Sequence, residues 1–310
     1  MSRISIILTV LAIATFANFS TADSQESPAI EISLIGIPPG STPSLLPGEP
    51  VEARLVVRVR EGAAMRPDLI LHIGSIAVPD SMLLMRPMRN KEGLPGSGKM
   101  EFILPLFFMG QPSTGDNEPA YLMRKPGQYA IWVEDRATGA SSARIMVTVR
   151  EFSSDDVKKS FEAYEKLKGV APILCFEKNV GTTGEDMDQF LETYGNSPYA
   201  PFVWLARGIQ RITALKGLPV GSKDEYDKRQ RDFAGTQSYF EKALAANPNT
   251  FVQQRALYFL ALTKAWAKDY ETAHKILTGL VSSYPSGAKS EDARRLLKEL
   301  EDHRGEWGRP

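Results

Sequence analysis

The sequence predicts a chain of two parts, a β-sandwich followed by an α-helical domain. Residues 51–60, VEARLVVRVR, largely alternate apolar and charged side chains, the period of a half-buried strand. Similar short runs, separated by turn residues, continue to Val149. After Phe152 the apolar residues recur at intervals of three and four, starting with SSDDVKKSFEAYEKLKG, which is typical of amphipathic helices. The change of period places the boundary between the two parts near Phe152.

The composition is that of an ordinary globular protein. Of the 310 residues, 43% are hydrophobic and 24% are charged, with 37 basic and 37 acidic side chains. A chain without net charge has no broad attraction for nucleic acid or an anionic membrane surface, since both need a basic face or tail. Neither is therefore expected as a partner.

The first 22 residues read as a secretory signal peptide. Arg3 precedes an apolar run over 4–17, and Ser20-Thr21-Ala22 offers a small-residue cleavage site, with Ala17 as the alternative. The run is shorter than the roughly 20 residues that a membrane-spanning helix needs. The sequence thus predicts a periplasmic or extracellular protein with no stable membrane anchor after cleavage. Since Cys175 is the only cysteine, the fold has no internal disulfide.

The β part is expected over 28–152. Besides 51–60 and 143–149, strands are predicted near Ile32–Ile37, Leu69–Ile73, Met82–Met85, Phe102–Phe108 and Gln128–Glu134. In KPGQYAIWVED, the spacing of Gly127, Tyr129 and Ile131 resembles the tyrosine corner of immunoglobulin-like sandwiches. Ile131 stands where antibody domains carry cysteine. The resemblance implies an immunoglobulin-like antiparallel sandwich and no particular activity.

The helical part is expected over 153–304. Helices are predicted at Asp155–Lys168, Glu185–Tyr194, Tyr199–Lys216, Lys223–Ala246, Phe251–Lys268, Tyr270–Tyr284 and Lys289–His303. The stretch ALYFLALTKAWAKDYETAHKILTGLVSSYP resembles a tetratricopeptide repeat, with Leu260-Ala261 as its packing pair and Pro285 at its end. A partial copy begins at Leu205-Ala206. The resemblance implies a degenerate repeat array over about 197–285, capped by SEDARRLLKEL.

Such repeats hold partners in a groove lined by their first helices. Aligning the two Leu-Ala pairs places six basic, polar and aromatic residues on this inner face: Arg207, Gln210, Arg211, Arg255, Tyr258 and Trp266. The resemblance implies a non-catalytic binding or scaffolding role, with a protein or an extended acidic peptide as partner. The alternative is that the aromatic residues pack against neighbouring helices and the arginines are solvated.

Motifs for catalysis are weak. KEGLPGSGKMEF has the glycine and lysine spacing of a phosphate-binding loop, but Met100 replaces the hydroxyl residue that holds Mg²⁺, and the segment that follows reads as a strand. His72, His274 and His303 are far apart, with no zinc or hydrolase spacing. No cofactor is expected. An enzyme with an unrecognised carboxylate site remains an alternative, because acids distant in sequence cannot be paired without a fold.

A second alternative is copper handling. Met82, Met85 and Met88 recur at intervals of three, and thioethers are soft ligands for Cu(I). In a strand this spacing sends neighbouring members to opposite faces, and methionine also fills irregular cores. Whether these methionines bind metal or only pack is left open by the sequence.

Overall fold

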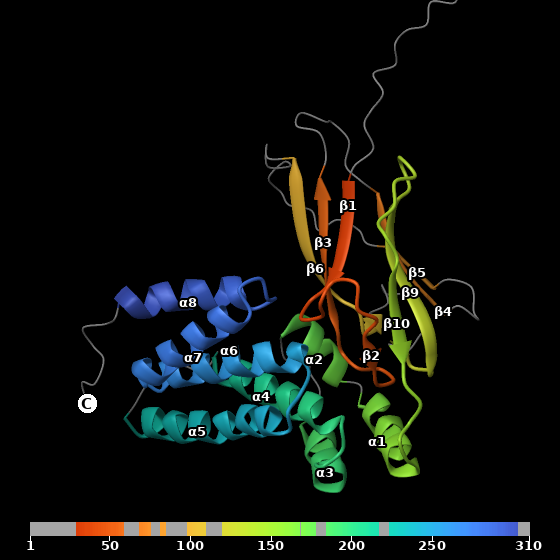
Figure 1. Ribbon diagram of the computed structural model, residues 1–310. Helices are drawn as coiled ribbons and strands as arrows, with labels where there is room; N and C mark the ends of the chain where they lie inside the picture. Colours follow the sequence, from red (N-terminus) through yellow and green to blue (C-terminus); the bar gives the residue numbers. More distant parts are fainter. Residues whose placement is uncertain are drawn as a thin grey trace, which may run out of the picture.

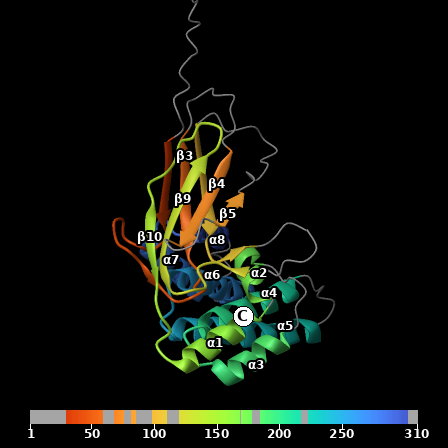
Figure 2. The same ribbon diagram turned by 90° about the vertical axis from the view of Figure 1, so that its right-hand side faces the viewer.

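The computed structural model describes residues 29–58, 68–75, 81–84, 98–109, 120–167, 169–177, 184–216 and 223–302. It has an N-terminal β region that stands on one end of a set of C-terminal helices (Figures 1 and 2). The predicted signal peptide, Gly93, Met85, Met88 and His303 lie outside the described residues. None of the described helices combines the length and apolar character needed to cross a membrane.

The β region has two main sheets. The first has the order β1-β3-β6, with bounds Ala29–Leu34, Glu52–Arg58 and Lys99–Pro105. The second has the order β2-β10-β9-β4-β5, with bounds Ser44–Leu45, Ile145–Val149, Gly127–Asp135, Leu69–Ser75 and Ser81–Leu84. Two short strands, β7 (Phe108–Met109) and β8 (Ala120–Tyr121), pair separately. Neighbouring strands are antiparallel, except that β2 runs parallel to β10.

The two sheets share an apolar core. In β3, Ala53, Leu55 and Val57 are fully buried, as the alternation predicts, and Ile131 of β9 joins them from the other sheet. The β3 residues that face outward include Arg54, which lies 3.1 Å from Glu101 of β6. The β part therefore has the layer structure that its period of two requires.

The start of β9 carries the predicted tyrosine. The Tyr129 hydroxyl donates a hydrogen bond to the Lys125 carbonyl, 2.9 Å away. This bond closes the turn before β9, two residues ahead of the fully buried Ile131.

Five residues separate the end of β10 from the first helix. The bounds of the helices are α1 Asp155–Glu165, α2 Val170–Phe176, α3 Glu185–Tyr194, α4 Ala200–Lys216, α5 Lys223–Ala245, α6 Thr250–Trp266, α7 Tyr270–Ser283 and α8 Ser290–Asp302. Side-chain caps start α1 at Ser154 and α6 at Asn249. Seven of the eight were predicted within a few residues.

The exception is α2, which the sequence did not predict. Its VAPILCF segment contains Pro172 in the first turn, where the missing N–H would have no helical partner anyway. The proline therefore does not prevent the helix. Val170, Ala171, Ile173 and Leu174 are buried.

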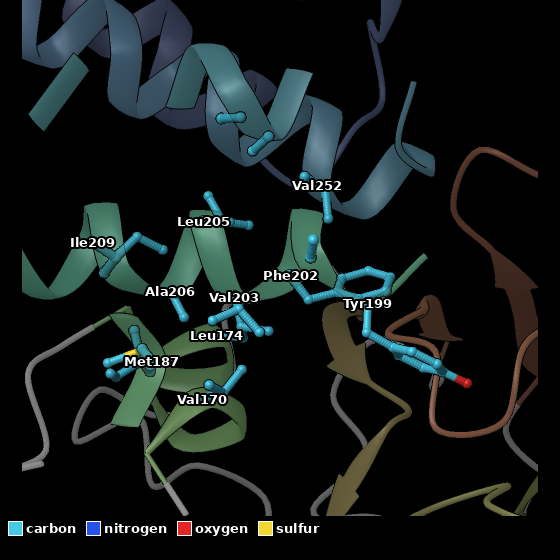
Figure 3. Close-up of a cluster of buried hydrophobic side chains, with 14 of the residues drawn as sticks. Val170, Leu174, Met187, Tyr199, Phe202, Val203, Leu205, Ala206, Ile209 and Val252 are labelled. Carbon is cyan, nitrogen blue, oxygen red and sulfur yellow. The ribbon is translucent and has the colours of Figure 1, made fainter. Parts of the chain in front are cut away.

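Successive helices from α4 to α8 pack side by side, and α4 also contacts α6, as α6 contacts α8. Helix α4 lies at the centre of the main core (Figure 3): Val203 and Ala206 face α2 and α3. Gly208 of α4 leaves room for the Phe240 ring of α5, because an added Cβ would lie 2.5 Å from that ring.

The β region and the helices share this core as well. Phe107, after β6, is fully buried and packs edge-on against Phe251 of α6, with ring centroids 5.2 Å apart. Tyr121 packs against Tyr164 of α1. The two regions thus meet through a continuous apolar junction.

We expect Gly48→Ala to weaken this junction. Gly48 has a φ of +65°, and an added Cβ would lie 2.7 Å from Phe161 Cε2. The left-handed backbone alone costs about 1–2 kcal/mol for alanine, and the contact adds to it. Gly40→Ala is the control, since Gly40 has a φ of +79° in open space. Urea unfolding should show a larger loss for Gly48→Ala, and equal losses would contradict the contact.

Candidate functional site

The inner face of α4 and α6, where the sequence predicted a partner groove, is occupied by the chain itself. Arg207 of α4 donates two hydrogen bonds to Asp188 of α3, at 2.9 and 2.7 Å. Its third nitrogen donates to Gln210 at 2.7 Å, and Gln210 is buried. An acidic partner is therefore already bound to Arg207, and it belongs to the same molecule.

Arg255 of α6 does not line an open groove. Its side chain is 7% exposed and forms a forked pair with Glu52 of β3, at 3.0 and 2.5 Å, while Glu52 is 3% exposed. Its Nε lies 3.1 Å from a Glu177 carboxylate oxygen at the end of α2. Burial acts to lower the pKa of Arg255, but both carboxylates raise it, and the net pKa is raised. This cation ties the β region to two helices.

The ion-pair network continues towards α8. Lys289 contacts Glu177 and lies 3.0 Å from Asp292. Its ammonium also lies 5.1 Å from the ring centroid of Tyr258. Tyr258 thus faces a cation of the chain, and burial raises its pKa to about 12.

The remaining two predicted residues face α5. Arg211 lies 3.4 Å from the Tyr239 hydroxyl, and Trp266 packs against Phe233. The six predicted residues therefore do not form one open surface. Four lie on the filled inner face and two lie towards α5.

A groove opens instead between α1, α4 and α5, and we call it the helix groove. Its volume is about 730 Å³. It is lined by α1 (Asp156, Val157, Ser160), residues 191–198, Trp204 of α4, and α5 with the residue after it (Lys242, Ala245, Ala246). The lining combines apolar walls with charges of both signs.

A row of alternating rings and cations starts at the helix groove: Trp204 and Lys242 line the groove, and Tyr239 and Arg211 continue the row outside its lining. The Lys242 ammonium lies 4.4 Å from the ring centroid of Trp204. The Trp204 ring lies 5.5 Å from that of Tyr239, over which Arg211 is placed at 5.7 Å. Trp204 is half-buried and Lys242 is exposed. Half-exposed aromatic rings beside cations are typical of surfaces that bind peptides.

A second cavity adjoins the helix groove at the junction with the β region. This junction pocket has a volume of about 540 Å³. It is lined by Leu46, Glu49, Arg150, residues 195–198, Pro201, Phe202 and residues 246–249. Residues 195–198 and Ala246 line both cavities. A ligand long enough to follow this loop could enter both.

Cys175 is not suited to nucleophilic chemistry. Burial raises the pKa of its thiol to about 12, with Arg255 lowering it and Glu52 raising it. At neutral pH the thiolate is therefore scarce. Cys175 packs against the main helical core.

Of the histidines and methionines considered for metal binding, only some lie within the residues that the structure describes. His72 of β4 is buried, stacks on Trp132 with ring centroids 4.6 Å apart, and lies opposite Met82 in the register of β4 and β5. Within the described ranges no group of three or more His, Cys, Asp or Glu side chains could hold a metal ion.

Both cavities depend on residues that sequence reasoning missed. The loop 195–198 joins two predicted helices, and its Gly, Asn, Ser and Pro residues indicated only a turn. Arg150 and Lys242 are ordinary charged residues in their segments. A weak signal was Trp204, a tryptophan one position before the predicted packing pair. Comparison of the sequence with models of protein families and with curated proteins gives no match.

Proposed function

We propose that the β region is an immunoglobulin-like sandwich. The strand pairing supports this, because β1, β3 and β6 form one sheet while β2, parallel to β10, starts the other. The hydrogen bond from Tyr129 to the Lys125 carbonyl supports a tyrosine corner. Sandwiches of this kind serve many functions, so this assignment concerns the fold alone.

We also propose that α4 to α8 form a degenerate tetratricopeptide-like array. The support is the chain of neighbouring helix contacts from α4 to α8, together with the contacts of α4 with α6 and α6 with α8. In such an array α4, α6 and α8 form the inner layer. Here Arg207 and Arg255 on that layer are neutralised by Asp188, Glu177 and Glu52 of the same chain.

The function that we propose is non-catalytic binding of an extended peptide or of a protein segment, in an exported protein. The helix groove is the proposed site, and the observation that carries it is the pair of Lys242 and Trp204 on its wall, with the ammonium 4.4 Å from the ring centroid. Trp204 supplies rigid apolar area, and Lys242 supplies a cation for one acidic group of the partner.

The test uses peptides selected for binding to the full mature chain from a display library of random heptapeptides with free C-termini. Trp204→Ala should weaken binding of the selected peptides about 30-fold, a loss of about 2 kcal/mol, because central aromatic residues dominate such interfaces. Isothermal titration calorimetry gives both dissociation constants.

Trp266→Ala is the matched control, since Trp266 is also half-buried but packs against Phe233 away from the helix groove. It should bind the peptides as the wild type does. Lys242→Glu changes an exposed residue and tests the same wall if Trp204→Ala is unstable. Binding that is lost with Trp266→Ala and kept with Trp204→Ala would move the site elsewhere.

A further inference from the structure

The junction pocket contains two charged side chains, and only one is free to bind a ligand. Glu49 is used internally: one carboxylate oxygen accepts from the Leu46 N–H at 2.7 Å, and the other accepts from the Asn249 amide at 2.9 Å. Burial raises its pKa, and these hydrogen bonds and Arg150 oppose that rise. Glu49 is therefore part of the junction.

Arg150 is the free group. It follows β10, its backbone is fixed by a 2.8 Å hydrogen bond from its N–H to the Leu45 carbonyl, and its side chain is exposed. Among the residues that the structure describes, this guanidinium makes no hydrogen bond or ion pair. It interacts with Glu49 only electrostatically, at longer range. Because its backbone is fixed and its guanidinium N–H groups have no hydrogen-bond partner, Arg150 can donate two parallel hydrogen bonds to a carboxylate.

Helix ends of both kinds surround Arg150. The starts of α4 (Pro198, Pro201) and α6 (Asn249) line the pocket. So do Gly195 and Ala246, which directly follow the C-terminal ends of α3 and α5. The helix dipoles therefore oppose one another, and the charge for an anion comes from Arg150. Asn196 and Asn247 line it too, and both are exposed. Asn249 is excluded as a ligand donor, since its amide is bound to Glu49 and the Pro50 carbonyl.

The position of the pocket indicates which carboxylate it would take. It adjoins the helix groove along 195–198, and Leu46 and Phe202 give it apolar walls beside Arg150. A peptide that extends from the helix groove across residues 195–198 would therefore place its next residue beside Arg150. One guanidinium pairs with one carboxylate, which suits the end of a chain better than a run of acidic side chains.

We propose that the junction pocket binds the C-terminal carboxylate of the peptide whose preceding residues occupy the helix groove. This inference rests on the proposed function. It narrows the partner to proteins or peptides whose C-termini are free and unstructured. Arg150 is the residue that distinguishes a chain end from an internal segment.

The test compares each selected heptapeptide with its C-terminally amidated twin. On the wild-type chain, amidation should weaken binding about tenfold or more, because it removes the charge that Arg150 pairs with. On Arg150→Gln, acid and amide should bind equally, and as weakly as the amide binds to the wild type. Arg58→Gln is the control, since Arg58 pairs with Glu31 and is the last residue of β3, a strand whose C-terminal end points away from the helices (Figure 1).

The outcomes separate this inference from the proposed function. Equal binding of acid and amide by the wild type would overturn it, even if Trp204→Ala still abolished binding. The inference would also be overturned if Arg150→Gln, folded and with the melting temperature of the wild type, still bound the acid form of the peptide more tightly than the amide. If Arg150→Gln does not fold, the comparison on the wild type decides alone. A library that yields no binding peptide would overturn both proposals.

Discussion

Replacing Arg255 by methionine is expected to lower the free energy of unfolding by about 3–5 kcal/mol. Methionine keeps much of the side-chain volume but leaves the carboxylate of Glu52, which is 3% exposed, without its forked partner. An uncompensated buried charge is costly because water cannot solvate it. Urea unfolding, followed by far-ultraviolet circular dichroism, measures the loss.

The double variant Glu52→Gln with Arg255→Met is the control for this prediction. Removing the charge on both sides should recover a large part of the loss, because the penalty arises from the orphaned carboxylate. If the double variant is as unstable as the sum of the two single variants, the two residues act independently. The forked pair would then not be what holds β3 against α6.

Phe107→Ala is expected to cost about 3–5 kcal/mol. The ring is fully buried among helix residues although it follows strand β6, so its removal leaves a cavity where the two regions meet. Phe102→Ala in β6 is the matched control, because Phe102 is only half-buried where it packs against the core between the two sheets. Its loss should be clearly smaller.

A second reading of Phe107→Ala comes from the shape of the unfolding curve. Because Phe107 and Tyr121 of the β region are buried in the main helical core, the wild type should unfold in one transition. Weakening the junction should separate the transitions of the β region and the helices. Equal losses for the two phenylalanine variants, with one transition in both, would contradict a special role for Phe107.

The secondary structure was largely predictable, because it is encoded in local periods. The predicted helix Glu185–Tyr194 has the observed bounds, and the alternation of 51–60 gave the buried face of β3. The predicted strand Phe102–Phe108 lay three residues too far along the chain, since β6 runs from Lys99 to Pro105 and Phe107 packs in the helical core. The two-residue strand β2 is too short to produce a period at all.

The site was much less predictable. The alignment of Leu205-Ala206 with Leu260-Ala261 identified residues on α4 and α6, but not what would cover them. Glu52 and Arg255 are 203 positions apart, and nothing local in VEARLVVRVR indicates that its one acidic residue is buried under a helix. Sequence reasoning found the basic face and assigned to a partner the carboxylates that the chain itself provides.

The most direct test of the peptide-binding account is hydrogen–deuterium exchange of the protein with and without a selected heptapeptide. The account predicts that added peptide slows exchange in 191–198 and in 242–249, which line the helix groove and the junction pocket. The amidated twin should protect 246–249 less, since it lacks the group that holds the chain end at Arg150. Slower exchange confined to α6 and α8, with 191–198 unchanged, would place the partner on the inner face and contradict the account.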